Sequence, residues 1–232
     1  MDFPIRINAY LAQKGLSTRR GADNLVSAGK VLINGKKASL GTKVNAGDKI
    51  EIRGNIQTKA LVYYAYNKPA GIITTMPQKG ETDIVGKTRF PTKVFPVGRL
   101  DKDSHGLIIM TNDGRITDRL LNPSKLHEKE YVVETDTDFN DAFLDKLSRG
   151  VELEDYTTKK AITRRKNSNT FYITLTEGKN RQIRKMCQVF GKTVTDLKRI
   201  RVMNIKLSSL PESSWREIKG KELAEFLKSL GL

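Results

Sequence analysis

The chain has 232 residues, of which 38% are hydrophobic and 29% charged, so it is long enough for a medium domain plus a small one, and this composition excludes wholesale disorder. Lysine and arginine total 42 against 26 aspartates and glutamates, and the resulting net charge of +16 favours a polyanionic partner, RNA or DNA before an anionic membrane. No apolar run approaches the roughly 20 residues that span a bilayer, so we expect no integral membrane protein.

The first residues show no charged segment followed by an apolar stretch, so we expect no secretory signal. Cys187 is the only cysteine, which excludes an internal disulfide and indicates a reducing, cytoplasmic location. Together with His105 and His127 it supplies too few ligands for a structural zinc site, and we expect no metal.

Residues 1–54 have the pattern of a small module of helices and short strands. Thr18 stands where an N-cap would begin a helix that ends at Gly29. The apolar run 31–33 leads into Asn34-Gly35, the strongest short hairpin signal in a sequence, and a further strand is expected at 49–52. The module is basic throughout.

This run, from Arg6 to Ile52, resembles an S4 domain, a small RNA-binding fold. The resemblance rests on Gly15-Leu16-Ser17-Thr18-Arg19-Arg20, Ala22-Asp23, Gly29-Lys30-Val31-Leu32-Ile33-Asn34-Gly35 and Gly47-Asp48-Lys49-Ile50. It implies that Arg19, Arg20, Lys30 and Lys36 contact RNA. The family usually has glutamate where this chain has Gly21, so Thr18 caps its helix without a reciprocal partner and we expect a softer helix start.

The polar segment 55–60 is predicted to be a linker, and 61–232 a second domain. Strands are expected at 61–66, at 107–110 and around the alternating Phe171, Ile173 and Leu175, and helices at 141–149, 181–190 and 221–230. Irregular interleaving of strands with few helices predicts an α+β domain on a mixed, largely antiparallel sheet.

Phe95 to Leu107 is a turn rich in glycine and charge that leads into an apolar strand, a common position for functional groups. Asp101, Asp103 and His105 imitate the opening of a calcium-binding EF-hand loop, although the twelfth position is Asn112 and the flanks indicate strands. Asp101 could also simply cap a turn.

Four motifs in order resemble those of the pseudouridine synthases of the RsuA, RluB and RluF type. Gly98-Arg99-Leu100-Asp101, with Asp103-Ser104, Gly106-Leu107 and Thr111-Asn112-Asp113-Gly114, is similar to the catalytic motif of that family. The others are Lys68-Pro69-Ala70-Gly71, Lys129-Glu130-Tyr131 and the basic run 177–186. The resemblance covers nearly the whole chain, and four ordered motifs are more specific than one.

The resemblance implies an enzyme that detaches uracil from C1′ of a uridine, rotates the base and rejoins it through C5. Asp101 would be the catalytic carboxylate, acting either as nucleophile at C1′ or as base at C2′. Arg184 would be its guanidinium partner, because a closed pocket would otherwise raise the pKa of the carboxylate. Neither redox cofactor nor ATP is required, and the sequence has neither a Walker A loop nor a dinucleotide fingerprint.

Tyr131 would stack on the uracil, whose rotation an aromatic face tolerates. The target uridine would flip out of its stack, with Arg99 beside it and Ile183 as a pocket wall. Arg181 and Lys185 would either bind phosphates or be a solvated helix face. Cys187 is interpreted as a small hydrophobe of the helix, not a nucleophile.

Two other function classes remain open at this point. The protein could be a non-catalytic S4-type RNA-binding or ribosome-assembly protein, or a different RNA-modifying enzyme such as a methyltransferase, for which no cofactor loop is visible. The expected substrate is ribosomal RNA, first 23S rRNA, with 16S rRNA or a tRNA as alternatives. No dimerisation heptad is present, so a monomer is expected.

Overall fold

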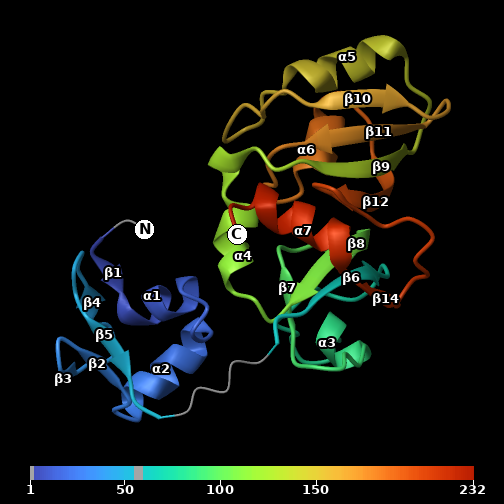
Figure 1. The fold of residues 1–232 in the computed structure, drawn as a ribbon. Helices are drawn as coiled ribbons and strands as arrows, with labels where there is room; N and C mark the ends of the chain where they lie inside the picture. The colour runs from blue at the N-terminus through green and yellow to red at the C-terminus, as the bar shows by residue number, and fades with distance from the viewer. Residues whose placement is uncertain (1–2, 55–59) are drawn as a thin grey trace. The chain divides into compact units, whose positions relative to one another are not determined.

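The computed structural model describes residues 3–54 and 60–232, which fall into two compact units (Figure 1). Met1–Val62 and Thr111–Asp118 belong to one unit, and Tyr63–Met110 and Arg119–Leu232 to the other. Apart from Ala60, the linker predicted at 55–60 lies outside the described residues, so the predicted domain boundaries stay predictions. No described helix is long and apolar enough to cross a membrane.

The N-terminal module consists of two helices that pack on short strands. Its elements are β1 (Ile5–Arg6), α1 (Ile7–Gln13), α2 (Arg19–Ser27), β2 (Val31–Ile33), β3 (Lys36–Lys37), β4 (Lys43–Val44) and β5 (Ile50–Ile52). The predicted N-cap is confirmed, because Thr18 Oγ1 accepts a hydrogen bond from the Gly21 N–H at 3.0 Å. A Cβ on Gly21 would lie 2.5 Å from Ser17 Oγ, so glycine suits this tight start even though it lowers helix propensity.

The predicted hairpin of the module is also confirmed. Asn34 and Gly35 join β2 to β3 with φ of 51° and 79°, the two positive values that a type I′ turn requires. β5 pairs with the other edge of β2. Buried residues of both helices and the strands form one core: Ile7, Leu11, Ala22, Val26, Val31, Ala38 and Val44.

The rest of the chain is built on one large mixed sheet, which confirms the predicted α+β class. Its order is β10-β11-β9-β12-β8-β6-β14, with β13 beside β12 and β7 beside β8. The strands are β6 (Tyr63–Lys68), β7 (Phe95–Val97), β8 (His105–Thr111), β9 (Lys129–Thr135), β10 (Ile162–Arg165), β11 (Thr170–Leu175), β12 (Val194–Val202), β13 (Ile205–Lys206) and β14 (Trp215–Glu217). β12 runs parallel to β8, and β9, β10 and β11 form antiparallel pairs.

The helices of this part are short, and the longer ones match the predicted segments. They are α3 (Ile84–Lys87), α4 (Arg115–Leu121), the 3₁₀ turn η1 (Pro123–Lys125), α5 (Asp141–Arg149), α6 (Gln182–Val189) and α7 (Gly220–Ser229). α5 is capped by Asn140 and buries Phe143, whose ring meets that of Phe171 on β11 edge to face. In α6, Ile183, Met186 and Cys187 are buried and form an apolar stripe.

Side-chain alternation gives β9 and β12 two different faces. Tyr131 lies opposite Arg199 of β12, and both are buried. The alternate residues Glu130, Val132 and Glu134 point to the other face, because successive side chains of a strand point to opposite sides of the sheet. We call the first the Tyr131 face and the second the groove face.

Candidate active site

Asp101 lies in the loop between β7 and β8, and its side chain is 31% exposed. Its backbone carbonyl accepts a hydrogen bond from the Ser104 N–H at 3.1 Å, which closes the turn. Within residues 3–54 and 60–232 the carboxylate accepts no hydrogen bond, so it does not cap the turn and that interpretation is wrong. The EF-hand interpretation is also wrong, because the loop leads into strand β8 and not into a helix.

Hydrogen bonds to the backbone on either side of Asp101 hold this loop in place. The hydroxyl of Thr74, itself buried, donates to the Leu100 carbonyl at 2.7 Å and accepts from the Leu100 N–H at 3.0 Å. The Gly71 N–H donates to the Lys102 carbonyl at 2.7 Å. Two residues flanking Asp101 are therefore fixed by a segment about 30 residues earlier in the chain. No motif or pattern in the sequence indicates this contribution of Thr74.

Lys68, of the Lys68-Pro69-Ala70-Gly71 motif, supports the other end of the loop. Its side chain is fully buried, and Nζ donates to the carbonyls of Ser104 at 2.7 Å and Pro69 at 3.0 Å. The pKa of this ammonium is lowered to about 8: burial is the main cause, Asp101 and Asp103 oppose the shift, and nearby Arg199 adds to it. The sequence motif includes Lys68 but does not indicate this structural role.

Arg184 of α6 meets the loop through Asp103 rather than Asp101. Its guanidinium donates to the Val194 carbonyl at 2.7 Å and to the Asp103 carbonyl at 3.2 Å, and its NH2 lies 3.2 Å from Asp103 Oδ2. These two carbonyls fix the planar fork, so the predicted Asp101–Arg184 ion pair is not formed. The cation within ion-pair distance of Asp101 is instead Arg181, at 3.9 Å between NH1 and Oδ2.

Asp103 is therefore the carboxylate that forms ion pairs with both Arg181 and Arg184. Burial raises its pKa, but the hydrogen bond from Arg181 and the charges of Arg184 and Arg181 outweigh burial and lower it overall. The Nε of Arg184 is buried and has no hydrogen-bond partner. The arrangement keeps two guanidinium groups next to the loop while leaving the Asp101 carboxylate partly open.

Tyr131 and α6 form the apolar side of the site. Tyr131 is 8% exposed and lies between Ile173 of β11 and Arg199 of β12. Ile183 is buried, in keeping with a pocket wall. Burial raises the pKa of the Cys187 thiol to about 12, which agrees with its interpretation as a hydrophobe rather than a nucleophile.

The remaining predicted RNA contacts lie on the surface. Arg99, Arg181 and Lys185 are exposed around the Asp101 loop and the start of α6, and Arg19, Arg20, Lys30 and Lys36 are exposed on the N-terminal module. Exposure makes these cations accessible to phosphates, and their roles stay predictions.

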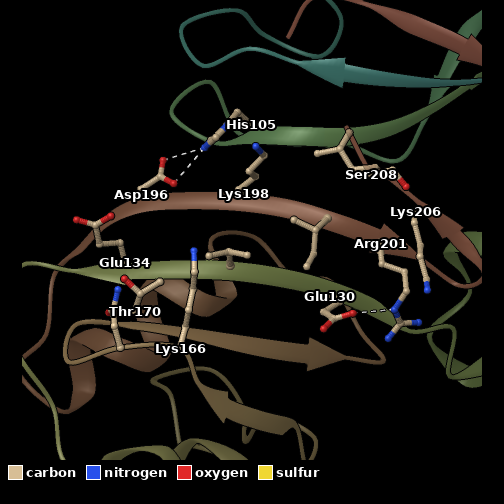
Figure 2. A pocket seen from close by; sticks show the side chains of 14 residues that line it. His105, Glu130, Glu134, Lys166, Thr170, Asp196, Lys198, Arg201, Lys206 and Ser208 are labelled. Carbon is tan, nitrogen blue, oxygen red and sulfur yellow. Dashed lines mark hydrogen bonds and ion pairs between the residues drawn. The ribbon is translucent and has the colours of Figure 1, made fainter. Parts of the chain in front are cut away.

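The groove face carries a cavity of about 630 Å³, shown in Figure 2. Two of its basic side chains contact carboxylates: His105 Nε2 lies 2.9 Å from Asp196 Oδ1, and Arg201 pairs with Glu130 at 2.8 Å and with Glu128 at 3.0 Å. Asp101, Tyr131 and Arg184 do not line it. The large cavity is thus separate from the predicted chemistry, and we locate the candidate site on the Tyr131 face.

Comparison with known proteins agrees with this geometry. Residues 62–189 match the family model described as RNA pseudouridylate synthase, and 5–50 match the S4 domain. The chain belongs to the RNA pseudouridylate synthase family. It is 39% identical to the dual-specificity RNA pseudouridine synthase RluF of Escherichia coli K12, over 98% of this chain and 80% of that protein. It is 33% identical to ribosomal large subunit pseudouridine synthase B of Bacillus subtilis, over 94% and 93% of the two chains.

A crystal structure of a pseudouridylate synthase superimposes with a TM-score of 0.70 and 25% identity, over 97% of this chain and 99% of that one. Within the family, His127-Glu128-Lys129-Glu130-Tyr131, Met186-Cys187 and 199–204 resemble ribosomal large subunit pseudouridine synthase F, in agreement with the identity to RluF. The enzyme is therefore an isomerase that acts on RNA.

Proposed function

We propose that this synthase converts a specific uridine of ribosomal RNA, first of all 23S rRNA, to pseudouridine, with Asp101 as the catalytic carboxylate. The observation that supports this role is the contrast between a rigid loop and a free side chain. Lys68 and Thr74 fix the backbone on both sides of Asp101, while its carboxylate accepts no hydrogen bond from the described residues. A group held in position but not used by the fold is available for substrate.

The chemistry needs a carboxylate next to the ribose. Asp101 would attack C1′ or remove the C2′ proton, and either route detaches uracil from C1′. Arg181, at 3.9 Å, and the α6 cations around Asp103 favour the ionised carboxylate in a site that RNA closes off from water. Arg184 would act on Asp101 through Asp103 and the loop, not by direct contact.

The target uridine would leave its stack to reach this site. Tyr131 would hold the uracil by its ring face, with Ile183 as the neighbouring wall, and exposed Arg99 would lie beside the flipped nucleotide. Phosphates on either side would meet Arg181 and Lys185, and the exposed cations of the N-terminal module would bind a second RNA segment.

The names of the relatives guide the choice of substrate. One relative is a ribosomal large subunit synthase, and others are named dual-specificity RNA synthases. We therefore propose 23S rRNA as the first substrate to test and keep 16S rRNA and tRNA as alternatives. A cytoplasmic, monomeric enzyme that needs no cofactor completes the proposal.

The test is conversion of uridine in purified RNA by the protein alone. Wild-type protein, without added cofactor, should form pseudouridine at one position of a 23S rRNA transcript, detected by carbodiimide labelling and primer extension. Asp101→Asn should slow conversion by at least about 10³-fold while the RNA Kd stays within about threefold. Lys102→Gln, the exposed neighbour, is the matched control and should keep activity.

Several outcomes would overturn the proposal. An active Asp101→Asn variant would show that another group is catalytic. RNA binding without conversion of any of the three RNA classes would favour the non-catalytic S4-type protein. Dependence on a methyl donor would favour a different RNA-modifying enzyme.

A further inference from the structure

Arg199 of β12 is a buried cation that forms no ion pair with any residue that the structure describes. It is 4% exposed, and its Nε donates to the Leu107 carbonyl at 2.7 Å. Within residues 3–54 and 60–232 its two terminal nitrogens have no hydrogen-bond or ion-pair partner. Buried charges in proteins are normally paired, since removing an ion from water costs several kcal/mol. The fold alone therefore leaves these two nitrogens unexplained.

The strand register locates Arg199 between the two sides of the site. Its Cα pairs with Gly106 of β8 on one side and with Tyr131 of β9 on the other. Gly106 comes five residues after Asp101, and a Cβ there would lie 2.3 Å from the Arg199 carbonyl oxygen. Pairing of β8 with β12 covers Lys198 and Arg199, and the hydrogen bond from Nε to the Leu107 carbonyl holds the Arg199 guanidinium against β8.

Two lysines increase the positive charge around this position. Lys68 is fully buried and Lys129 is partly buried, and the pKa of each ammonium is lowered to about 8, mainly by desolvation and in part by Arg199, while Asp101 and Asp103 oppose the shift of Lys68. Neither lysine forms an ion pair within the described chain, and Nζ of Lys129 reaches only the His127 carbonyl, at 3.5 Å. Such a cluster repels itself in the free protein and is relieved by a negative group.

The proposed reaction produces a negative group at the adjacent position. When the C1′–N1 bond breaks, both bonding electrons leave with uracil, and the charge of this anion spreads over its ring nitrogens and its two carbonyl oxygens. After rotation, an electron pair at C5 forms the C1′–C5 bond, which displaces the Asp101 carboxylate from C1′ or, on the C2′ route, is accompanied by return of the proton from Asp101 to C2′. The C5 proton then passes to solvent or a base and N1 takes up a proton, so that neutral pseudouridine and the free Asp101 carboxylate result. A donor aimed at the carbonyl oxygens would be most effective while the base is detached.

We propose that Arg199 is a catalytic residue whose guanidinium donates to a carbonyl oxygen of uracil and stabilises the detached uracil anion. This inference rests on the proposed function, because it takes Tyr131 as the residue that stacks on the base. Arg199 lies directly opposite Tyr131 on the neighbouring strand. A long side chain at this position can reach the edge of a uracil that stacks on the tyrosine. Lys68 and Lys129 add charge without contacting the base.

The test separates rate from binding with three variants and single-turnover kinetics at saturating enzyme. Arg199→Gln removes the charge but keeps an N–H donor for the Leu107 carbonyl. Its rate should fall about 10² to 10³-fold, as for loss of one oxyanion donor, with an RNA Kd within about threefold of wild type. Arg199→Lys keeps the charge without the planar fork and should recover about tenfold of that loss.

Arg201→Gln is the matched control, because this arginine lies on the same strand beyond the register shift that follows Arg199, and it is held by Glu128 and Glu130 on the groove face. It should stay within about twofold of the wild-type rate. Assays at 15 °C, with circular dichroism of each variant, ensure that only folded protein is compared. If Arg199→Gln is unfolded even there, the rate of folded Arg199→Lys decides: a wild-type rate would overturn the proposal.

The outcomes distinguish this inference from the proposed function. An inactive wild-type protein would remove the proposed function itself. Active wild type with Arg199→Gln within threefold of its rate would overturn the inference alone. A weaker Kd with an unchanged saturating rate, and a log Kd against log salt slope reduced by about 0.7 to 0.9, would show a phosphate contact and would also overturn it.

Discussion

The two faces of strands β9 and β12 differ in whether their arginines are paired with carboxylates. On the groove face, Arg201 is enclosed by Glu128 and Glu130, and His105 lies against Asp196. On the Tyr131 face, Arg199 donates one hydrogen bond to a carbonyl and has no carboxylate partner within the described chain. Paired cations are explained by the stability of the folded chain. A buried cation that the fold leaves unpaired costs stability, and a ligand that pairs with it would offset this cost.

The largest expected effect on stability comes from adding a side chain at Gly106, where the backbones of β8 and β12 lie in close contact. Gly106 has φ of +103°, and a Cβ there would lie 2.3 Å from the Arg199 carbonyl oxygen and 2.8 Å from its nitrogen. Both atoms are backbone, so Gly106→Ala must push β12 away or unpair it. We expect a loss of more than about 3 kcal/mol in the free energy of urea unfolding.

Gly178→Ala is the control for this change, because Gly178 has nothing within 4 Å of an added Cβ and no positive φ. It should change the unfolding free energy by less than about 0.5 kcal/mol. Equal stability of the two variants would mean that β8 and β12 are not held together at Gly106.

A smaller effect is expected from the support of the Asp101 loop. Thr74→Val keeps the shape of the side chain but removes both hydrogen bonds to Leu100, leaving a buried N–H and a buried carbonyl unpaired. We expect a loss of about 2 kcal/mol in unfolding free energy and about a tenfold lower single-turnover rate, because Asp101 is less well positioned.

Thr158→Val is the matched control for Thr74. Thr158 is also buried and also bonds backbone, accepting from the Val151 N–H at 2.9 Å, but it lies outside the loop. Its loss of stability should leave the rate of folded enzyme unchanged. A rate for Thr74→Val equal to that of the control would contradict the view that the loop is held for catalysis.

The smallest effect is a gain in stability that depends on pH. Since the folded pKa of Lys129 is lowered to about 8 from 10.5, the folded protein binds this proton more weakly than the unfolded chain. The penalty is complete below pH 8 and shrinks as pH rises from 8 toward 10.5. Lys129→Met should therefore raise the unfolding free energy by about 1 kcal/mol at pH 7 and by less at pH 9.5.

Urea unfolding of wild type and variant at both pH values measures this gap. Lys198→Met, an adjacent lysine that lines the groove face, is the control. A gap for Lys129→Met that is constant between pH 7 and 9.5, or of opposite sign, would show that no cation cluster strains the Tyr131 face.

Local features were predictable because nearby residues determine them. The Thr18 cap and the Asn34-Gly35 turn depend on neighbours within three residues, and the stripe of Ile183, Met186 and Cys187 on one helical period. The mixed sheet followed from strand content, and the family from ordered motifs. Asp101 was found by its motif alone.

Contacts across the sheet were not predictable, because strand order and register decide them. Lys68 reaches Ser104, and the charge of Arg199 acts on Lys68, only once β6, β8 and β12 lie side by side. The partner of Arg184 was misassigned for the same reason. Arg199 did carry one signal: it has the same parity as buried Leu197 along an extended run, which indicates an inward-pointing arginine.

The parallel pairing of β12 with β8 also sets when the enzyme can begin to work. Asp101 and Tyr131 are synthesised well before β12 (Val194–Val202). In the sheet, however, β12 lies between β8, which follows the Asp101 loop, and β9, which carries Tyr131. A nascent chain released before this strand would hold the carboxylate and the tyrosine without the element that joins them. Contacts so distant in sequence form late in folding, so on the proposed mechanism the site can be completed only after Val194–Val202 has left the ribosome.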